Sequence, residues 1–449
     1  MNMIWEPSKN IPVIEDCDIC VLGGSCTGLF AAVRAARLGA RVVIVEKQNC
    51  FGGVATSGMV NIWHSLYNTT FEKQIIAGLT HEVIERLMKR KAVSLEKDNK
   101  TSYYSLNTEE LKIELDELAA ESKIKPYLHT LYTAPYLEDG ELKAVFVESK
   151  SGRGAIKAKV FIDATGDGDL CSHLGLDVSV PETKQPPTTC VRLSGISNLK
   201  KSEYDRLLNE HRKEFNLPEG FMWSSSIPGL PETVQYAATR VNNANCLDAC
   251  SLTYSEMEAR RQVRAIMDII RKYGPEDSRD VSLAALPSYI GVRETRHVKC
   301  LYTLTEKGIL TGRRFEDAIA NGTYRIDIHH NDKPGLTFKY LDGTEIYIRD
   351  GYPSVPGRWR EEQPENPTFY QIPFRSIVPG KYKNILLCGR SLDADKGAFG
   401  AVRVMVNLNQ TGEAAGTAAY LALDSGRGVD RIDIRKLRGT LTKGGSIII

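Results

Sequence analysis

The stretch VLGGSCTGLF, residues 21–30, places glycines at the spacing of a turn that joins a strand to a helix. The apolar run DICVL (18–22) in front of it predicts a buried parallel strand. The segment LFAAVRAARLG (29–39) behind it repeats apolar residues at helical spacing and ends in a glycine, which favours a helix end there. A further apolar run, RVVIVE (41–46), closes with Glu46. This order of strand, glycine turn, helix, strand and acid is typical of a dinucleotide-binding unit.

The turn departs from the G-x-G-x-x-G pattern at one place. Gly23 and Gly28 occupy the outer positions, and Ser25 occupies the middle one. The middle residue lets the backbone approach a pyrophosphate, and serine adds only a small side chain whose hydroxyl can itself donate to phosphate. Glu46 stands where a carboxylate can bind ribose hydroxyls, and an acid at that place favours a ribose without phosphate. We therefore expect the unit to bind a dinucleotide despite the serine.

Length and charge narrow the class of protein. A chain of 449 residues exceeds the size at which a single core stops growing, so two structural domains are expected. Lys and Arg number 58 against 56 Asp and Glu, a balance that gives no broad basic field for nucleic acid or anionic lipid. No apolar stretch has transmembrane length, and the first residues lack the basic start and apolar run of a signal peptide. These features predict a soluble cytoplasmic protein without a nucleic-acid or membrane partner.

The ten cysteines are predicted to be free thiols. Cys17 and Cys20 form a C-x-x-C, but residues three apart in a strand point to opposite faces, which favours packed apolar residues over a redox or metal pair. Cys246 and Cys250 can share a helix face, yet further zinc ligands are not evident near them in the sequence. No metal site is predicted.

Three further segments carry a resemblance to a known family: KQNCFGGVATSG (47–58), KAKVFIDATGDGDL (157–170) and NILLCGRSLDADKGAFGAVRVM (384–405). With them the chain resembles FAD-dependent oxidoreductases of the glutathione-reductase and succinate-dehydrogenase-flavoprotein type, and more narrowly a bacterial family of FAD-dependent oxidoreductases. The resemblance implies an α/β fold, with a Rossmann-like FAD-binding domain of the glutathione-reductase type and an inserted α+β substrate domain. The FAD-binding domain would comprise residues 1–190 and 369–449, and the substrate domain residues 191–368.

The resemblance also implies which residues contact FAD. The glycine turn and the first helical amides would bind the pyrophosphate, and a last helix over about 402–423 would point its N-terminus, with Arg403 in its first turn, at the pyrimidine end of the flavin. Arg403 can equally be a solvated arginine. Arg390 stands where relatives carry an acid, which removes the usual carboxylate contact. The residues implied are Gly23, Gly24, Ser25, Cys26, Thr27, Gly28, Glu46, Lys47, Gly52, Gly53, Thr165, Gly166, Gly389, Arg390, Gly400, Ala401, Val402 and Arg403.

The type of reaction is narrowed by motifs that the sequence lacks. Disulfide reductases of this superfamily carry a C-x-x-x-x-C pair after the Gly-Gly loop, and the stretch GGVATSGMVNIWHS (52–65) has no cysteine. A second strand, turn and acid unit for NAD(P)H is not evident either. We expect hydride transfer between flavin and a small polar substrate (a hydroxy acid, sugar or sugar acid), with an unidentified electron acceptor or donor. Two alternatives stay open: a fumarate-reductase-like reductase of an activated double bond, and a flavin-containing RNA-modification subunit. The oligomeric state is open between a monomer and a homo-oligomer.

Candidate substrate-binding residues follow from charge and position. In GVRETRHV (291–298), Arg293 and Arg296 are suited to clamp a carboxylate, and a helical segment would place both on one face with His297. The alternative is an ion-pair network around Glu294. His64 follows the flavin loop and is suited to acid–base chemistry or covalent flavin attachment. The catalytic candidates are therefore Arg293, Arg296, His64 and His297. Weaker candidates are His329, His330 and Arg375, which are equally suited to structural roles.

Overall fold

A computed structural model describes residues 3–97, 102–196, 198–220 and 222–449. Its central sheet is built from parallel strands extended at one side by an antiparallel meander. The parallel strands are, in order, β6 (Lys125–Tyr127), β2 (Val42–Val45), β1 (Val13–Leu22), β9 (Gly152–Asp163) and β22 (Ile385–Leu387). The meander adds β8 (Glu141–Ser149) and β7 (Leu131–Glu138) next to the first half of β9.

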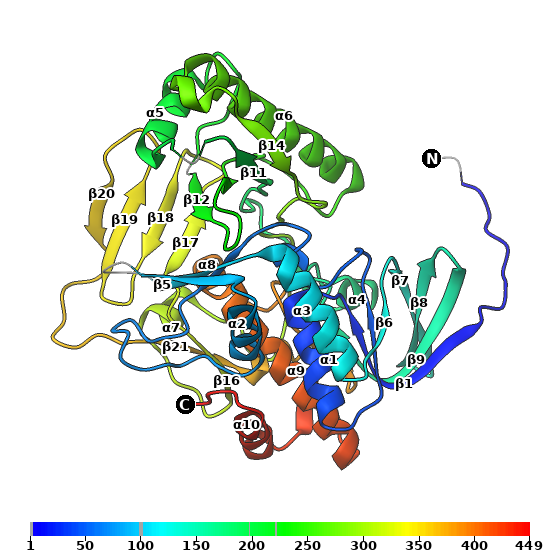
Figure 1. The fold of residues 1–449 in the computed structure, drawn as a ribbon. Coiled ribbons are helices and arrows are strands. Elements are labelled where there is room, and N and C mark those ends of the chain that lie inside the picture. The colour runs from blue at the N-terminus through cyan, green and yellow to red at the C-terminus, as the bar shows by residue number, and fades with distance from the viewer. Residues whose placement is uncertain (1–2, 98–101, 197, 221) are drawn as a thin grey trace.

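The parallel strands are apolar because helices cover them. All four residues of β2 and the last four of β1 are buried, as expected for a parallel sheet enclosed by crossover helices. The helix α1 (Cys26–Arg37) packs against the long helix α9 (Met405–Ser425), and α3 (Thr108–Glu121) and α2 (Leu79–Lys89) lie beside them (Figure 1). The predicted strand, turn, helix and strand over residues 18–46 are confirmed.

Glycines set the close approach of α9 to α1. A Cβ atom at Gly412 would lie 2.0 Å from the Thr27 carbonyl oxygen, and one at Gly416 would lie 2.0 Å from the Ala31 carbonyl oxygen. Contacts this short are with backbone, so no side-chain movement relieves them. Small residues on α9 therefore fix the position of the helix that follows the glycine turn.

Replacing Gly416 by alanine is expected to lower the free energy of unfolding by about 1–3 kcal/mol, because the added methyl group forces the two helices apart. Urea denaturation measures the change. The matched control is Gly439→Ala in α10 (Ile434–Lys443), where a Cβ meets no atom within 4 Å. That control should raise stability by about 0.5–1 kcal/mol, as alanine does in an exposed helix. Equal urea midpoints for both variants would contradict the packing argument.

A second lobe lies above the central sheet (Figure 1). A cluster of buried apolar side chains joins its helices to one of its two sheets, separate from the large cluster around the central sheet. The first sheet runs in the order β12 (Trp223–Ser226), β13 (Thr233–Ala237), β11 (Cys190–Ser194) and β14 (Ser282–Ala285), and is covered by α5 (Lys201–His211) and α6 (Ala249–Tyr273). The second runs in the order β17 (Ile326–His329), β18 (Leu336–Lys339), β19 (Thr344–Ile348) and β20 (Val355–Arg358).

The chain also contains shorter sheets and helices. They are the sheet β3 (Ile62–His64), β5 (Ser102–Leu106) and β4 (Val93–Lys97), the pair β16 (Ala318–Gly322) and β21 (Tyr370–Pro373), the pair β10 (Val178–Ser179) and β15 (His297–Val298), and the helices α4 (Asp169–His173), α7 (Glu306–Leu310) and α8 (Lys396–Val402).

Two sequence predictions about secondary structure are wrong. The last long helix does not begin near residue 402: α8 ends at Val402, Val404 adopts an extended conformation with ψ of 146°, and α9 begins at Met405. Arg403 therefore lies in the break between two helices instead of in a first helical turn. Residues 292–296 form no helix, and the chain enters the short strand β15 at His297. Arg293 and Arg296 consequently share no helical face.

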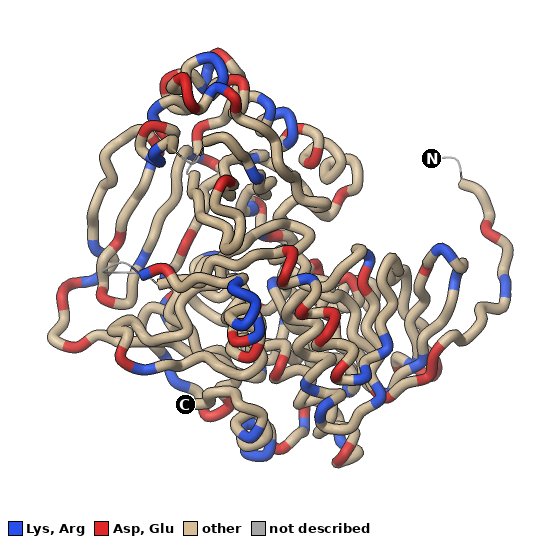
Figure 2. Tube along the Cα trace, in the orientation of Figure 1, with Lys and Arg blue, Asp and Glu red and all other residues tan. Residues whose placement is uncertain are grey.

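Charges of both signs are mixed along the described chain. Figure 2 shows Lys and Arg interspersed with Asp and Glu along α6 and around the lower helices, in line with a formal net charge of +2. Within the described residues, none of the helices combines the length and hydropathy needed to cross a bilayer.

Candidate functional site

A cavity of about 450 Å³ lies at the carboxyl ends of the central strands, between them and the second lobe. This edge of a parallel sheet is where ligands bind in doubly wound folds, and the volume is in the range of small-molecule sites. Turns after β1, β2, β9 and β22 supply one wall, and β17, β18 and the segment before β15 supply the other.

The glycine turn forms one end of the cavity. Gly23 has a φ of +105°, and a Cβ at Gly28 would lie 2.0 Å from the Gly23 carbonyl oxygen, so both outer glycines are required by the backbone. The Ser25 Oγ accepts from the Gly28 amide at 3.3 Å and caps α1. Cys26 and Thr27, whose amides have no partner inside the helix, line the cavity. Ser25 thus stabilises the N-terminus of α1, and its hydroxyl group can still donate a hydrogen bond to a ligand in the cavity.

The loop that follows β2 closes against this turn. The Gly52 amide donates to the Gly24 carbonyl at 2.8 Å, and a Cβ at Gly53 would lie 2.9 Å from the Ser25 Cβ. Glu46 is buried, and its carboxylate accepts from the Gly24 amide at 2.5 Å and from the Gln48 amide at 2.8 Å. These glycines form a cradle that is too tight for any added side chain. The cradle and the helix N-terminus fit the diphosphate of a dinucleotide such as FAD, and the Glu46 carboxylate fits its ribose.

Arg390 and Lys47 bring positive charge to the same region. Arg390 donates to Asp167, which also accepts from the Thr295 hydroxyl at 2.8 Å. Burial alone would raise the pKa of Asp167, but Arg390 and Lys47 outweigh it and hold that pKa below its usual value. The Lys47 Nζ lies 5.1 Å from the centre of the Tyr289 ring. Arg390 is thus paired with its own counterion, Asp167, at the edge of the cavity.

The opposite wall is organised around Asp327 on β17. Its Oδ2 accepts from the Tyr324 hydroxyl at 2.8 Å and from an Arg403 nitrogen at 3.0 Å, and its Oδ1 lies 3.3 Å from the His329 Nε2. Burial alone would raise the pKa of Asp327, but its contacts with His329 and Arg403 outweigh burial and hold that pKa well below its usual value. Asp327 is therefore an anion that fixes the position of three cavity side chains.

Arg240 fixes the tautomer of His329. An Arg240 nitrogen lies 3.1 Å from the His329 Nδ1, and because a guanidinium has donors only, Nδ1 must accept. The proton of a neutral His329 then sits on Nε2, facing Asp327. Burial and the nearby Arg293 lower the pKa of His329 to about 3, which agrees with a neutral ring.

Removing this donor provides a direct test. In Arg240→Met, we expect the share of the Nε2–H form of His329 to fall, because Asp327, 3.3 Å from Nε2, is then left alone in favouring that form. The imidazole ¹⁵N shifts of histidine-labelled protein report the tautomer. Arg212→Met, which removes an arginine paired with Glu219 instead, is the matched control and should leave His329 unchanged. An unaltered His329 spectrum in Arg240→Met would show that the arginine does not set the tautomer.

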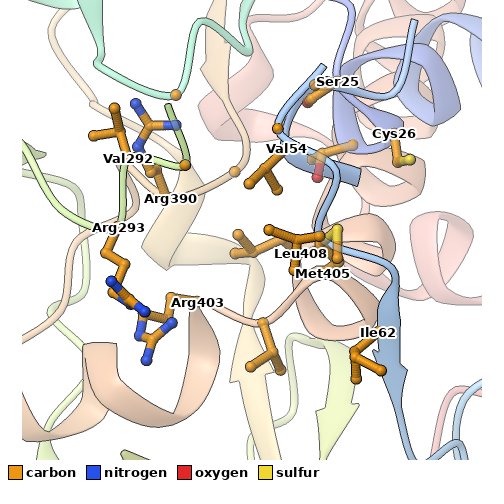
Figure 3. A pocket seen from close by; sticks show the side chains of 18 of the residues that line it. Ser25, Cys26, Val54, Ile62, Val292, Arg293, Arg390, Arg403, Met405 and Leu408 are labelled. Atoms are coloured by element: carbon orange, nitrogen blue, oxygen red, sulfur yellow. The ribbon is translucent and has the colours of Figure 1, made fainter. Parts of the chain in front are cut away.

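Arg293 and Arg403 lie next to each other on the wall opposite Ile62 (Figure 3). Arg293 donates to the Thr188 hydroxyl at 2.6 Å and to the Pro186 carbonyl, both uncharged groups. Burial and the positive charges of Arg403 and Arg240 lower the pKa of Arg293 to about 9. Beyond burial, the two neighbouring arginines contribute positive charge that Asp327 opposes. This wall is suited to an anionic ligand.

His64, at the end of β3, completes this part of the cavity. Its ring lies 4.1 Å from the Tyr324 ring, measured between centroids. Burial and the charge of Arg325 lower the pKa of His64 to about 3. His64 is therefore neutral in the structure as it stands.

Most predicted site residues line the cavity. They are Gly23, Ser25, Cys26, Thr27, Glu46, Lys47, Gly52, Gly53, His64, Thr165, Gly166, Arg293, Gly389, Arg390 and Arg403, together with the weaker candidate His329. Gly24 and Gly28 are not part of the wall, but they shape it through the contacts with Glu46 and Gly23 described above.

Arg296 and His297 lie outside the cavity wall. Arg296 faces Asp169 at 3.6 Å, and His297 contacts the Glu294 carboxylate at 3.2 Å and the Leu392 carbonyl oxygen at 3.1 Å. Residues 292–296 form no regular element, and Arg296 and His297 contact Asp169, Glu294 and Leu392 instead, so the predicted Arg293–Arg296 clamp does not form. Glu294 contacts His297 and accepts from the Gln185 amide at 2.9 Å, whereas Arg293 and Arg296 contact other residues, so the alternative of an ion-pair network of these arginines around Glu294 does not form either.

The other predicted site residues that do not line the cavity are buried in a helix or contact other protein groups. Gly400, Ala401 and Val402 are buried in α8 because the long helix starts later than expected. Arg375 pairs with Asp317 at 2.9 Å, and His330 contacts the Thr337 hydroxyl at 2.8 Å.

Sequence reasoning missed Tyr324, Asp327 and Arg240. A signal for Asp327 exists: Arg325, Asp327 and His329 alternate at the period of a strand, which places all three on one face, and all three line the cavity. Nothing in the sequence points to Arg240, which reaches His329 from 89 positions away.

Comparison with known proteins supplies the family. A family model described as FAD dependent oxidoreductase matches residues 18–441. No curated protein matches the chain. A solved geranylgeranyl bacteriochlorophyll reductase-like protein from Thermoplasma acidophilum is 12% identical, with a TM-score of 0.47 over 96% of this chain and 84% of that one. A flavoprotein/dehydrogenase from Cytophaga hutchinsonii is also 12% identical, with a TM-score of 0.45 over 95% and 83% of the two chains.

Proposed function

Because this chain belongs to the FAD-dependent oxidoreductase family, we propose that it transfers a hydride between FAD and a small organic acid whose carboxylate binds beside Arg293 and Arg403. The observation that carries the proposal is the pair of adjacent guanidinium groups on one cavity wall. Asp327 is the anion bound to Arg403, and the hydrogen bonds of Arg293 to described residues go to the uncharged Pro186 carbonyl and Thr188 hydroxyl. A carboxylate matches two guanidinium groups in charge and in hydrogen-bond geometry.

The cofactor would be held by the opposite end of the cavity. The first amides of α1 and the Ser25 hydroxyl are suited to the diphosphate, Glu46 to the adenosine ribose, and Lys47 and Arg390 to the remaining negative charge. When bound, FAD supplies the redox chemistry, accepting or giving two electrons with a hydride. Residues 191–368 would act as the substrate domain, since the second wall comes mainly from them.

The protein's own side chains would hold and orient the acid. Arg293 and Arg403 bind the carboxylate, and the Asp327 contact keeps the Arg403 guanidinium in place. Apolar side chains from the middle of the cavity, including Ile62, Met405 and Leu408, exclude water from the space between its two polar ends (Figure 3). His64 carries the proton that accompanies the hydride.

Matched substrate pairs test the proposal. FAD-loaded enzyme is mixed without oxygen with α-hydroxy acids and with their amides, which keep the hydroxyl and the carbon skeleton but lose the charge. Bleaching of the flavin absorbance by one or more acids, and much slower bleaching by the paired amides, is expected. Equal rates for acid and amide would rule out the arginine pair as the basis of recognition.

A further inference from the structure

We propose that His64 is the proton acceptor of this site and that an anion in the space beside Arg293 and Arg403 makes it a stronger base. The inference rests on the proposed function, because it assigns to the substrate carboxylate a second role. In this view the charge of the substrate switches on the base that its own oxidation needs.

The geometry links the imidazole to the arginine pair through two side chains. The His64 ring packs on Tyr324, whose hydroxyl donates to the Asp327 Oδ2 at 2.8 Å. An Arg403 nitrogen donates to the same oxygen at 3.0 Å. His64, Tyr324, Asp327 and Arg403 all line the cavity, so an anion next to Arg403 lies in the same buried space as the imidazole.

The charges that face His64 come from three elements. Arg325 and Asp327 lie on or next to β17, and Arg403 lies between α8 and α9. Tyr103 stands opposite His64 in the register of β3 and β5, and adds no charge at neutral pH. Two cations and one anion leave a net positive field at the ring.

Burial and that field together account for the weak basicity of His64 without an anion. Burial comes first in lowering the pKa of His64, Arg325 and Arg403 lower it further, and Asp327 opposes them. A carboxylate beside Arg403 adds a second negative charge, which cancels the excess and favours the imidazolium. A neutral compound in the same place leaves the ring a poor base.

The step balances for oxidation of a hydroxy acid. The C–H bond breaks and its electron pair passes with the hydrogen to oxidised FAD, while the O–H bond breaks and its proton passes to the His64 ring. A carbonyl forms on the product, and the flavin is reduced by two electrons. When the product anion leaves, the positive field returns and His64 releases the proton to solvent. The carboxylate that holds the substrate on the arginines therefore also resets the base when it leaves with the product.

Trifluoroacetate is a suitable probe, because it remains ionised across the pH range and carries no hydrogen to be transferred. FAD-loaded enzyme labelled with ¹⁵N-histidine is titrated from pH 8 down to about pH 2.5 with and without it, and the His64 signal is assigned as the one lost in His64→Asn. Saturable perturbation of the flavin absorbance reports binding independently. With the anion bound, the His64 midpoint should rise by about one to two pH units, as expected for one charge nearby in a buried site.

Two variants sharpen the result. In Arg403→Ala the anion-dependent shift should disappear, and the midpoint without anion should already be higher, because a cation has gone. Arg375→Ala, which removes an arginine outside the cavity, should leave the shift intact. Saturable trifluoroacetate binding with an unmoved His64 midpoint would overturn the switch and leave the proposed function standing. No saturable binding would overturn the anion site itself and the switch with it.

Discussion

Replacing both Arg293 and Arg403 by alanine is expected to lower kcat/KM for the acid substrate by about 10²- to 10⁴-fold. Each charged hydrogen bond to a ligand contributes about 1.5–3 kcal/mol, and every 1.4 kcal/mol corresponds to a factor of ten. The double variant removes two such donors from a desolvated wall and also leaves Asp327 without its Arg403 contact. Steady-state kinetics with an active acid measure the loss.

The controls for the arginine pair separate charge from folding. Arg375→Ala removes an arginine that pairs with Asp317 away from the cavity, and it should leave kcat/KM within a few-fold of the wild type. The bound flavin absorbance of the double variant should match that of the wild type, since neither arginine belongs to the glycine cradle. Full retention of activity in the double variant would remove the arginine pair from the site.

Gly28→Ala is expected to abolish stable FAD binding. The added Cβ would lie 2.0 Å from the Gly23 carbonyl oxygen, so the turn between β1 and α1 must open and the amides of Cys26 and Thr27 move away from the diphosphate. The ratio of flavin to protein absorbance after gel filtration measures the loss, which should be nearly complete.

Gly439→Ala is again the matched control, because it adds the same methyl group to a helix where nothing lies within 4 Å. Thermal unfolding followed by circular dichroism shows whether Gly28→Ala still folds. A folded variant without flavin supports the cradle, whereas a folded variant with full flavin content would contradict it.

The parts of the molecule that could be predicted from sequence are those in which neighbours along the chain also meet in space. The unit from β1 through β2 lies within residues 13–46, and the places of Ser25, Gly28 and Glu46 follow from motif spacing alone. The Gly52–Gly53 loop and Arg390 were implied by the family resemblance, and each lies in a segment that follows a strand of the central sheet.

The substrate end could not be predicted, because its contacts join distant segments. Arg293 and Arg403 belong to different parts of the sequence and meet only through the fold. Arg403 lies at the break between α8 and α9. The extended conformation of Val404 that makes this break cannot be predicted from the periodicity of apolar residues. His64 was identified by its place after the flavin loop, but its dependence on Asp327 and Arg403 appears only when β3 and β17 face the same cavity.

The most direct test of hydride transfer from an anionic substrate is the rate of anaerobic flavin bleaching with a hydroxy acid that carries deuterium on the carbon bearing the hydroxyl. We predict that the acid bleaches the flavin, and that the deuterated acid does so more slowly, because the C–H bond breaks in the step that reduces FAD. Bleaching at the same rate for both isotopic forms, or bleaching by nicotinamide cofactors and by none of the acids, would contradict the account.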